Sequence, residues 1–143
     1  MISTTNPEQA KKLIKQEKAP IIVEAQNDDF NRKILEYGKF DILLSPEKGQ
    51  RKDSQKQLDS GLNHVLAEIA SKNKVAIGIN LAEIQSLDKK SKAQRLAKIK
   101  QNIKLCRKSK TLIKVLNFQD KLNAHNFLVS LGASTEQAKK AFE

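Results

Sequence analysis

The sequence is poor in the residues on which several common classes of protein depend. Among its 143 residues there is one cysteine, no tryptophan, one tyrosine, five phenylalanines and two histidines. A single cysteine cannot form an intramolecular disulfide, which indicates a reducing, intracellular setting. No stretch approaches the roughly 20 apolar residues of a membrane-spanning helix, and the N-terminal residues lack the apolar core of a secretion signal. We therefore expect a cytoplasmic protein with no membrane partner.

Proline and glycine are also scarce, with three and five residues respectively. This composition does not suggest a disordered or low-complexity chain. We find no internal repeat and no linker, so residues 1–143 are expected to form a single domain. With few aromatic side chains, the core of that domain must be mainly aliphatic.

Acidic side chains are unevenly distributed along the chain. Residues 1–72 carry 12 basic and 11 acidic side chains, whereas residues 73–143 carry 15 basic and 5 acidic ones. The formal charge of +11 therefore lies almost entirely in the second half. A one-sided positive field of this size favours binding to a polyanion, of which RNA and DNA are the usual examples.

Short apolar runs alternate with longer segments of helical spacing, which predicts an α/β fold. The runs, rich in Ile, Val and Leu, are typical of strands buried on both faces of a parallel sheet. We expect strands at residues 21–25, 40–44, 75–81 and 112–116, and helices at residues 7–18, 28–37, 54–72, 91–109, 119–131 and 135–142. Asn6-Pro7 and Ser134 with Gln137 are expected helix starts, and Gly38 and Gly132 expected helix ends.

The segment from Lys89 to Lys110 has ten basic side chains and no acidic one. In its expected helix, Leu96, Ile99, Ile103 and Cys106 form a narrow apolar stripe, and basic residues fill the remaining circumference. Such side chains bind nucleic acid mainly through its phosphates. The predicted RNA contacts are Lys89, Lys90, Lys92, Arg95, Lys98, Lys104, Arg107 and Lys108, with a second patch at Lys48, Arg51, Lys52 and Lys56. A charged helix face that only meets water is the alternative interpretation.

Residues suited to catalysis or metal binding are few. Neither His64 nor His125 belongs to a metal-binding motif, and Asp41 and Asp120 have no acidic neighbour in sequence. Cys106 falls on an apolar stripe, which favours core packing over nucleophilic work. We therefore predict no catalytic residue, no metal site and no cofactor bound by the chain.

The order and spacing of several segments resemble ribonuclease P protein component 3, the archaeal relative of the eukaryotic thirty-kilodalton subunit. The clearest match is Leu-Asn-His-Val-Leu-Ala-Glu-Ile-Ala at residues 62–70, leading into the run at residues 75–81. Further matches are residues 21–23, 31–33, 40–46, 95–108 and 131–138. The chain differs from the family pattern at Ser45, where many members have histidine, at Asn63, often aspartate, and at residues 117–126.

This resemblance implies a protein subunit of ribonuclease P, which removes the 5′ leader from precursor tRNA. The family's role would be to bind and stabilise the catalytic RNA with a small partner protein subunit, contacting precursor tRNA only indirectly. Cleavage and its magnesium would belong to the RNA subunit. The chain would be a non-catalytic part of an endoribonuclease holoenzyme.

The resemblance also implies parallel βα repeats of a TIM-type (β/α) barrel, similar to phosphoesterase-type barrels. The sequence supplies about four strands, so we expect a partial barrel whose open sheet edges pair with a second copy or another partner, or a rearranged open sheet. Two other functions stay open: a degenerate metal-dependent phosphoesterase-type barrel, and a general RNA-binding assembly factor.

Overall fold

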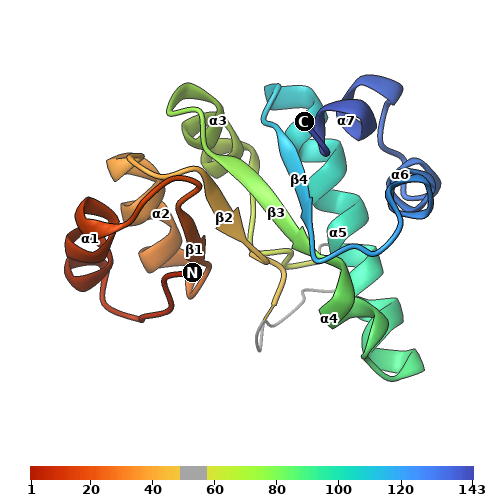
Figure 1. The fold of residues 1–143 in the computed structure, drawn as a ribbon, viewed down its shortest axis with the longest axis horizontal. Helices are drawn as coiled ribbons and strands as arrows, with labels where there is room; N and C mark the ends of the chain where they lie inside the picture. Colours follow the sequence, from red (N-terminus) through yellow and green to blue (C-terminus); the bar gives the residue numbers. More distant parts are fainter. Residues whose placement is uncertain (49–57) are drawn as a thin grey trace.

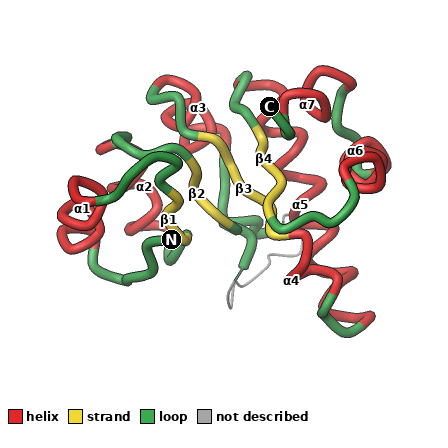
Figure 2. The backbone as a smooth tube through the Cα atoms, viewed as in Figure 1, coloured by secondary structure: helices red, strands yellow, loops and turns green. Residues whose placement is uncertain are grey.

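The computed structural model describes residues 1–48 and 58–143. Four strands lie side by side in one all-parallel sheet, in the order β1-β2-β3-β4 (Figures 1 and 2). They are β1 (Ile22–Glu24), β2 (Ile42–Leu44), β3 (Ala76–Asn80) and β4 (Ile113–Leu116). The predicted parallel α/β fold and all four predicted strands are therefore confirmed, each strand slightly shorter than its apolar run.

Helices alternate with these strands along the chain. They are α1 (Pro7–Gln16), α2 (Asp28–Tyr37), α3 (His64–Lys72), α4 (Leu81–Gln85), α5 (Lys89–Ser109), α6 (Lys121–Ser130) and α7 (Thr135–Lys140). Because successive strands are neighbours, right-handed crossovers place their connecting helices on the same side of the sheet. This singly wound arrangement is consistent with a partial (β/α) barrel of four strands, where a complete barrel has eight.

Local capping explains where several helices begin and end. The Asn6 side chain accepts hydrogen bonds from the first turn of α1, and Pro7 occupies its first position. Ser134 and Gln137 form a reciprocal capping box at α7. Gly38 ends α2 in the left-handed conformation, with φ 67°, and Gly132 follows α6 at φ 97°. These predicted helix limits are confirmed.

One predicted helix begins much later than expected. Helical spacing suggested a start at residue 54, but α3 begins at His64 and residues 58–63 are not helical. The Asn63 side chain accepts a hydrogen bond from the Leu66 amide and so caps α3 at this point. Residues 54–57 lie outside the described residues. The short helix α4, which directly follows β3, was not predicted at all.

The main core lies between the sheet and the crossover helices, which lie on one side of it. Fully or nearly fully buried members include Leu43 of β2, Ile77 of β3, Ile34 of α2 and Ile103 of α5. Cys106 belongs to the same cluster and is 0% exposed, as its apolar stripe predicted. Removing such side chains from water is the main source of stability in the fold.

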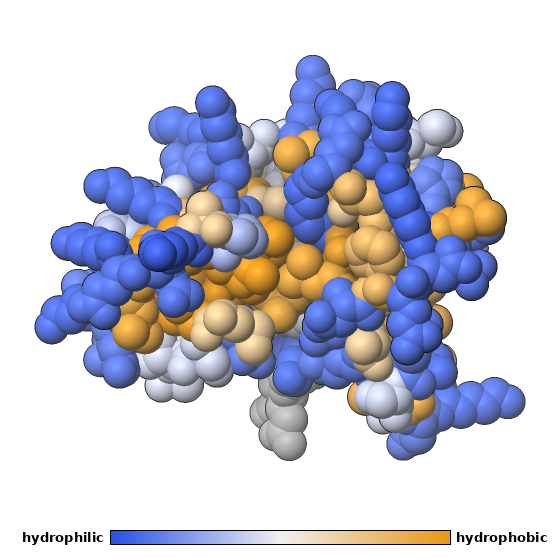
Figure 3. Space-filling model, in the orientation of Figure 1, coloured by the Kyte–Doolittle hydropathy of each residue, from blue (hydrophilic) through white to orange (hydrophobic). Residues whose placement is uncertain are grey.

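The opposite face of the sheet is also apolar. Successive strand side chains point to opposite faces, so Ile42, Leu44, Ala76 and Gly78 share the face that points away from the main core. A methyl group on Gly78 would lie 2.6 Å from Ile42 Cγ2, which shows that neighbouring side chains close over this glycine. Figure 3 shows a hydrophobic band across the centre of the view, where Figure 1 places the strands.

The two sheet edges are less open than the sequence suggested. At the β1 edge, Ile2 forms an isolated parallel bridge with Val23. At the β4 edge, the Val115 amide donates a hydrogen bond to the carbonyl oxygen of Ala141, just after α7. Each edge is thus partly paired within the chain itself. None of the helices in the described ranges combines the length and apolarity needed to cross a membrane.

Candidate nucleic-acid interface

Helix α5 is the longest helix and presents the basic residues on a defined face. Its 21 residues extend about 31 Å at 1.5 Å per residue. Ile99, Asn102, Ile103 and Cys106 form the buried side of the helix. The remaining side faces solvent and carries most of the cations of the segment. The helix therefore presents a long, positively charged surface to solvent and packs against the core through its buried side.

Four exposed cations near the C-terminal half of α5 share one face. They are Lys100, Lys104, Arg107 and Lys108, at spacings of three, four, seven and eight residues that bring side chains together on a helix. We call this group the α5 basic stripe. Since no acidic residue occurs between Lys89 and Lys110, none of its lysines has an intrahelical ion-pair partner. Lys100, Lys104 and Lys108 are therefore available to an external anion, whereas the Arg107 guanidinium donates to the carbonyl oxygen of Gly132.

The first turn of α5 departs from the usual charge preference of helices. Helix N-termini favour acidic side chains, because the helix dipole is positive there. Asp88 caps the helix by accepting from the Ser91 amide, an interaction that lowers the pKa of the Asp88 carboxyl. The first turn itself contains no acidic residue, and Lys89, Lys90 and Lys92 add charge of the same sign as the dipole. Basic side chains at a helix N-terminus are locally unfavourable, and departures of this kind are typical of binding sites.

Arg95 does not lie where the sequence interpretation placed it. Its guanidinium is 11% exposed and donates from Nη1 to Glu83 Oε1 at 2.8 Å and from Nη2 to Glu47 Oε1 at 3.1 Å. Position 95 is four residues before Ile99 and eight before Ile103, so it belongs to the buried side of α5. The predicted contact of Arg95 with RNA phosphate conflicts with this position.

The second predicted basic patch is described only in part. Lys48 is exposed, but its ammonium lies 3.5 Å from Glu24 and 3.4 Å from Glu83. Arg51, Lys52 and Lys56 lie outside the described residues. Lys98 of the first group is half-buried. Of the predicted contacts that the structure describes, only Lys104, Arg107 and Lys108 fall into one exposed stripe. Lys89 and Lys90 are exposed at the other end of α5, and Lys92 is half-buried.

The carboxyl ends of the strands carry an ion-pair cluster rather than a set of converging acids. Glu24 ends β1, Glu47 follows β2, and Glu83 follows β3; Arg95 and Lys48 join them. Burial raises the pKa of the Glu47 carboxyl, while Arg95 opposes this effect. Within residues 1–48 and 58–143, no group of three or more His, Cys, Asp or Glu side chains is placed to hold a metal ion. The cluster ties α5 to the sheet.

Comparisons with known proteins find similar proteins that share one name. No family model matches the chain. It is 34% identical over 113 residues to ribonuclease P protein component 3 of Methanococcus maripaludis strain C7, an alignment covering 77% of this chain and 46% of the relative. The corresponding protein of Methanocaldococcus jannaschii is 35% identical over 88 residues, covering 62% and 35% of the two chains. The chain is thus similar to ribonuclease P protein component 3 of both archaea, at 34% and 35% identity over the aligned residues.

A solved structure supports the same relationship. A chain in a cryo-EM structure of archaeal ribonuclease P with mature tRNA superposes with a TM-score of 0.79 and 29% identity, covering 98% of this chain and 62% of that one. The resemblance to component 3 inferred from the sequence is thus confirmed. The chain spans less than half the length of the component 3 relatives that it matches.

Proposed function

We propose that the chain is a protein subunit of ribonuclease P that binds and stabilises the catalytic RNA during 5′-leader removal from precursor tRNA. The observation that carries this proposal is the α5 basic stripe in a chain that is similar to component 3. The archaeal ribonuclease P structure that contains the structural neighbour supports a place in a multi-subunit ribonucleoprotein.

The stripe suits a polyphosphate backbone rather than particular bases. Lysine and arginine gain binding free energy by releasing the counterions condensed on nucleic acid. Contacts of this kind set the position and orientation of a protein without reading sequence. The exposed aromatic residues are few, with Phe118 37% exposed and packed edge-to-face against Phe142. Stacking on unpaired bases is therefore a minor contribution, and the shape and backbone of the RNA are what the chain recognises.

A direct catalytic role is not part of the proposal. The acidic groups at the carboxyl ends of the strands are engaged by Arg95 and Lys48. No observation in the described residues favours the phosphoesterase alternative. In the holoenzyme, magnesium held by the RNA subunit would supply the cleavage chemistry, and the chain would lower the magnesium concentration that the RNA needs to fold.

The partial barrel makes a further protein contact part of the proposal. The described sheet has four strands, whereas a complete (β/α) barrel has eight. The apolar face that points away from the main core is already closely packed, since Ile42, Leu44 and Ala76 are 8%, 5% and 5% exposed. We propose that a second copy of the chain pairs with this partial barrel. Light scattering tests this: a mass near 32 kDa, twice 16.1 kDa, is expected, and a monomer at micromolar concentration would exclude the second copy.

The function is tested by reconstitution with the cognate ribonuclease P RNA, precursor tRNA and the small partner protein subunit. Adding the chain should lower the magnesium concentration at half-maximal cleavage. The double variant Lys104→Gln, Lys108→Gln should lose most of this effect. Its control is Lys12→Gln, Lys15→Gln, which removes two exposed charges from α1 instead.

Two results would count against the proposal. If the chain left the magnesium requirement unchanged, it would not be a ribonuclease P subunit that stabilises RNA. If pull-down from the native cell recovered another structured RNA and no ribonuclease P RNA, the chain would be an assembly factor for a different ribonucleoprotein.

A further inference from the structure

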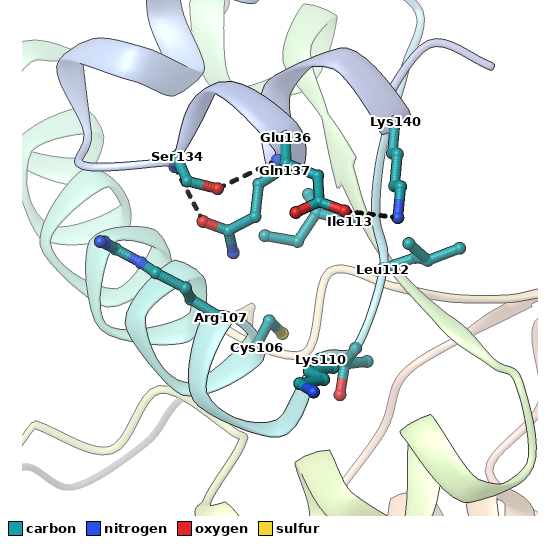
Figure 4. Close-up of a pocket in the computed structure, with 10 residues that line it drawn as sticks. Cys106, Arg107, Lys110, Leu112, Ile113, Ser134, Glu136, Gln137 and Lys140 are labelled. Atoms are coloured by element: carbon teal, nitrogen blue, oxygen red, sulfur yellow. Dashed lines mark hydrogen bonds and ion pairs between the residues drawn. The ribbon is translucent and has the colours of Figure 1, made fainter.

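A cavity of about 360 Å³ lies between the C-terminal end of α5 and helix α7. It opens at the amino end of β4, which is the opposite end of the sheet from the Glu47–Arg95 ion pair. Figure 4 shows Arg107, Lys110 and Lys140 on three sides of it, with Glu136 and Gln137 between them. The cavity was not predicted, because its walls come from two segments, residues 106–113 and residues 134–140, that are separate in sequence.

The walls are fixed by specific contacts. Lys110 ends α5 in the left-handed conformation, with φ 62°. The Arg107 guanidinium donates to the carbonyl oxygen of Gly132, which ties α5 to the turn before α7. Gln137 donates from Nε2 to the carbonyl oxygen of Ile103 at 3.1 Å, and the capping box with Ser134 sets the start of α7. A cavity held by contacts of this kind is formed before any ligand arrives.

Positive charge dominates this cavity. Three cations line it, against one carboxylate. Lys140 forms an ion pair with Glu136 at 2.8 Å, an i,i+4 contact in which both side chains are largely exposed. This hydrogen bond, together with the nearby charges of Lys140 and Lys110, lowers the pKa of the Glu136 carboxyl. The Lys110 ammonium forms no hydrogen bond or ion pair with a described residue. The side chains that line the cavity therefore carry a net positive charge, because one carboxylate opposes three cations.

The cavity also has an apolar wall. Leu112, just before β4, lines it and is 44% exposed. Cys106 and Ile113 lie deeper in the same wall and are buried. The volume is within the range of sites for small organic groups, and it exceeds what a bare inorganic anion requires. The ligand should therefore combine an anionic group with a less polar body.

We infer that this cavity binds one nucleotide of RNA, its phosphate held by Lys110 and Lys140 and its sugar or base against Leu112. The cavity continues the α5 basic stripe, which ends at Lys108, so a single RNA backbone can follow both. This inference rests on the proposed RNA binding and adds a second, preformed contact to it. A free nucleotide offers the same phosphate, sugar and base, so the second test compares binding of a free nucleotide with binding of RNA.

The first test uses affinity for ribonuclease P RNA. Glu136→Gln removes the opposing carboxylate, leaves Lys140 unpaired, and should tighten binding about two- to fivefold. The matched control is Glu36→Gln on α2, where Glu36 forms a similar exposed i,i+4 pair with Arg32. The control should change affinity much less. Conversely, Lys110→Gln should weaken binding about two- to fivefold and reduce the salt dependence by about one unit of slope.

The second test locates the contact. Backbone amide signals of Lys110, Leu112 and Gln137 in the full chain are followed by NMR during titration with a short single-stranded RNA and, separately, with adenosine 5′-monophosphate. Saturating shifts at lower concentrations of the RNA support the inference. Tighter binding of the monophosphate than of the RNA would overturn it in favour of a free-nucleotide site.

The outcomes distinguish this inference from the function on which it rests. If the α5 stripe variants weaken RNA binding while Lys110→Gln and Glu136→Gln do not alter it, the cavity is not a nucleotide site and the proposed function survives. If the chain binds no RNA at all, both proposals fail.

Discussion

The Arg95 guanidinium lies 3.1 Å from the carboxylate of Glu47, whose side chain is only 1% exposed. The two residues are 48 positions apart, and their contact joins α5 to the loop after β2. Glu83 shares the same arginine at 2.8 Å. This contact explains why one arginine of the most basic helix points inward while its neighbours face solvent: it neutralises acid at the carboxyl ends of the strands.

Replacing Arg95 should destabilise the fold rather than act on RNA contacts directly. In Arg95→Met, Glu47 stays buried without its partner, and breaking such a pair costs about 3–5 kcal/mol of unfolding free energy. Urea denaturation measures the loss. Lys100→Met, at an exposed position of the same helix, is the control and should cost much less. Equal, small losses for the two variants would show that the buried pair contributes little.

Glu47 and Glu83 should give opposite pH dependences of stability. Burial raises the pKa of Glu47 above 4.5, so the folded chain binds this proton more tightly than the unfolded chain does, and stability falls as pH rises above 4.5 through the folded pKa. Burial would also raise the pKa of Glu83, but hydrogen bonding with Arg95 and the charges of Lys48 and Arg95 lower it overall. The stability that the Glu83 carboxylate contributes is therefore present above pH 4.5 and is lost as the pH falls below 4.5 through the lowered pKa.

Unfolding free energies of the wild type, Glu47→Gln and Glu83→Gln between pH 3 and pH 7 check these signs. The wild type minus Glu47→Gln difference should become less favourable as pH rises, and the wild type minus Glu83→Gln difference should become more favourable. If the two differences changed in the same direction with pH, the pKa values of Glu47 and Glu83 would not be shifted in opposite directions as described.

Cys106 should be chemically inert in the folded chain. Its side chain is 0% exposed, and burial raises the pKa of its thiol to about 12. The thiolate is the reactive form, so a disulfide reagent at pH 8 should react only after unfolding in urea. Absorbance of the released thiol reports the rate. Fast reaction in native buffer would mean that α5 separates readily from the core.

Much of the fold could be predicted because it follows from local rules. Apolar runs located all four strands, and capping residues such as Asn6, Ser134 and Gly38 located helix limits. The start of α3 was misplaced because Leu58 and Leu62 continue the apolar spacing of the helix, although both precede the cap at Asn63. Spacing alone does not reveal a non-helical segment that carries apolar side chains at similar intervals.

The candidate interface could be predicted in part. The basic segment was found from charge alone, but Arg95 was assigned to the exposed side despite its four-residue spacing from Ile99. Lys100 was omitted, although it stands four residues before Lys104 on the same face. Helical spacing contained both signals. Lys110 and Lys140 could not be grouped from the sequence, since only packing of α7 beside the end of α5 brings them to one cavity.

The most direct test of RNA binding by the α5 basic stripe is the salt dependence of affinity for ribonuclease P RNA. The triple variant Lys100→Gln, Lys104→Gln, Lys108→Gln is compared with Lys12→Gln, Lys15→Gln, Lys18→Gln, which removes the same charge from α1 and the loop that follows it. If the stripe contacts phosphates, the magnitude of the slope of log affinity against log salt should fall by about two to three in the first variant only. An unchanged slope, or equal losses in both variants, would contradict the account.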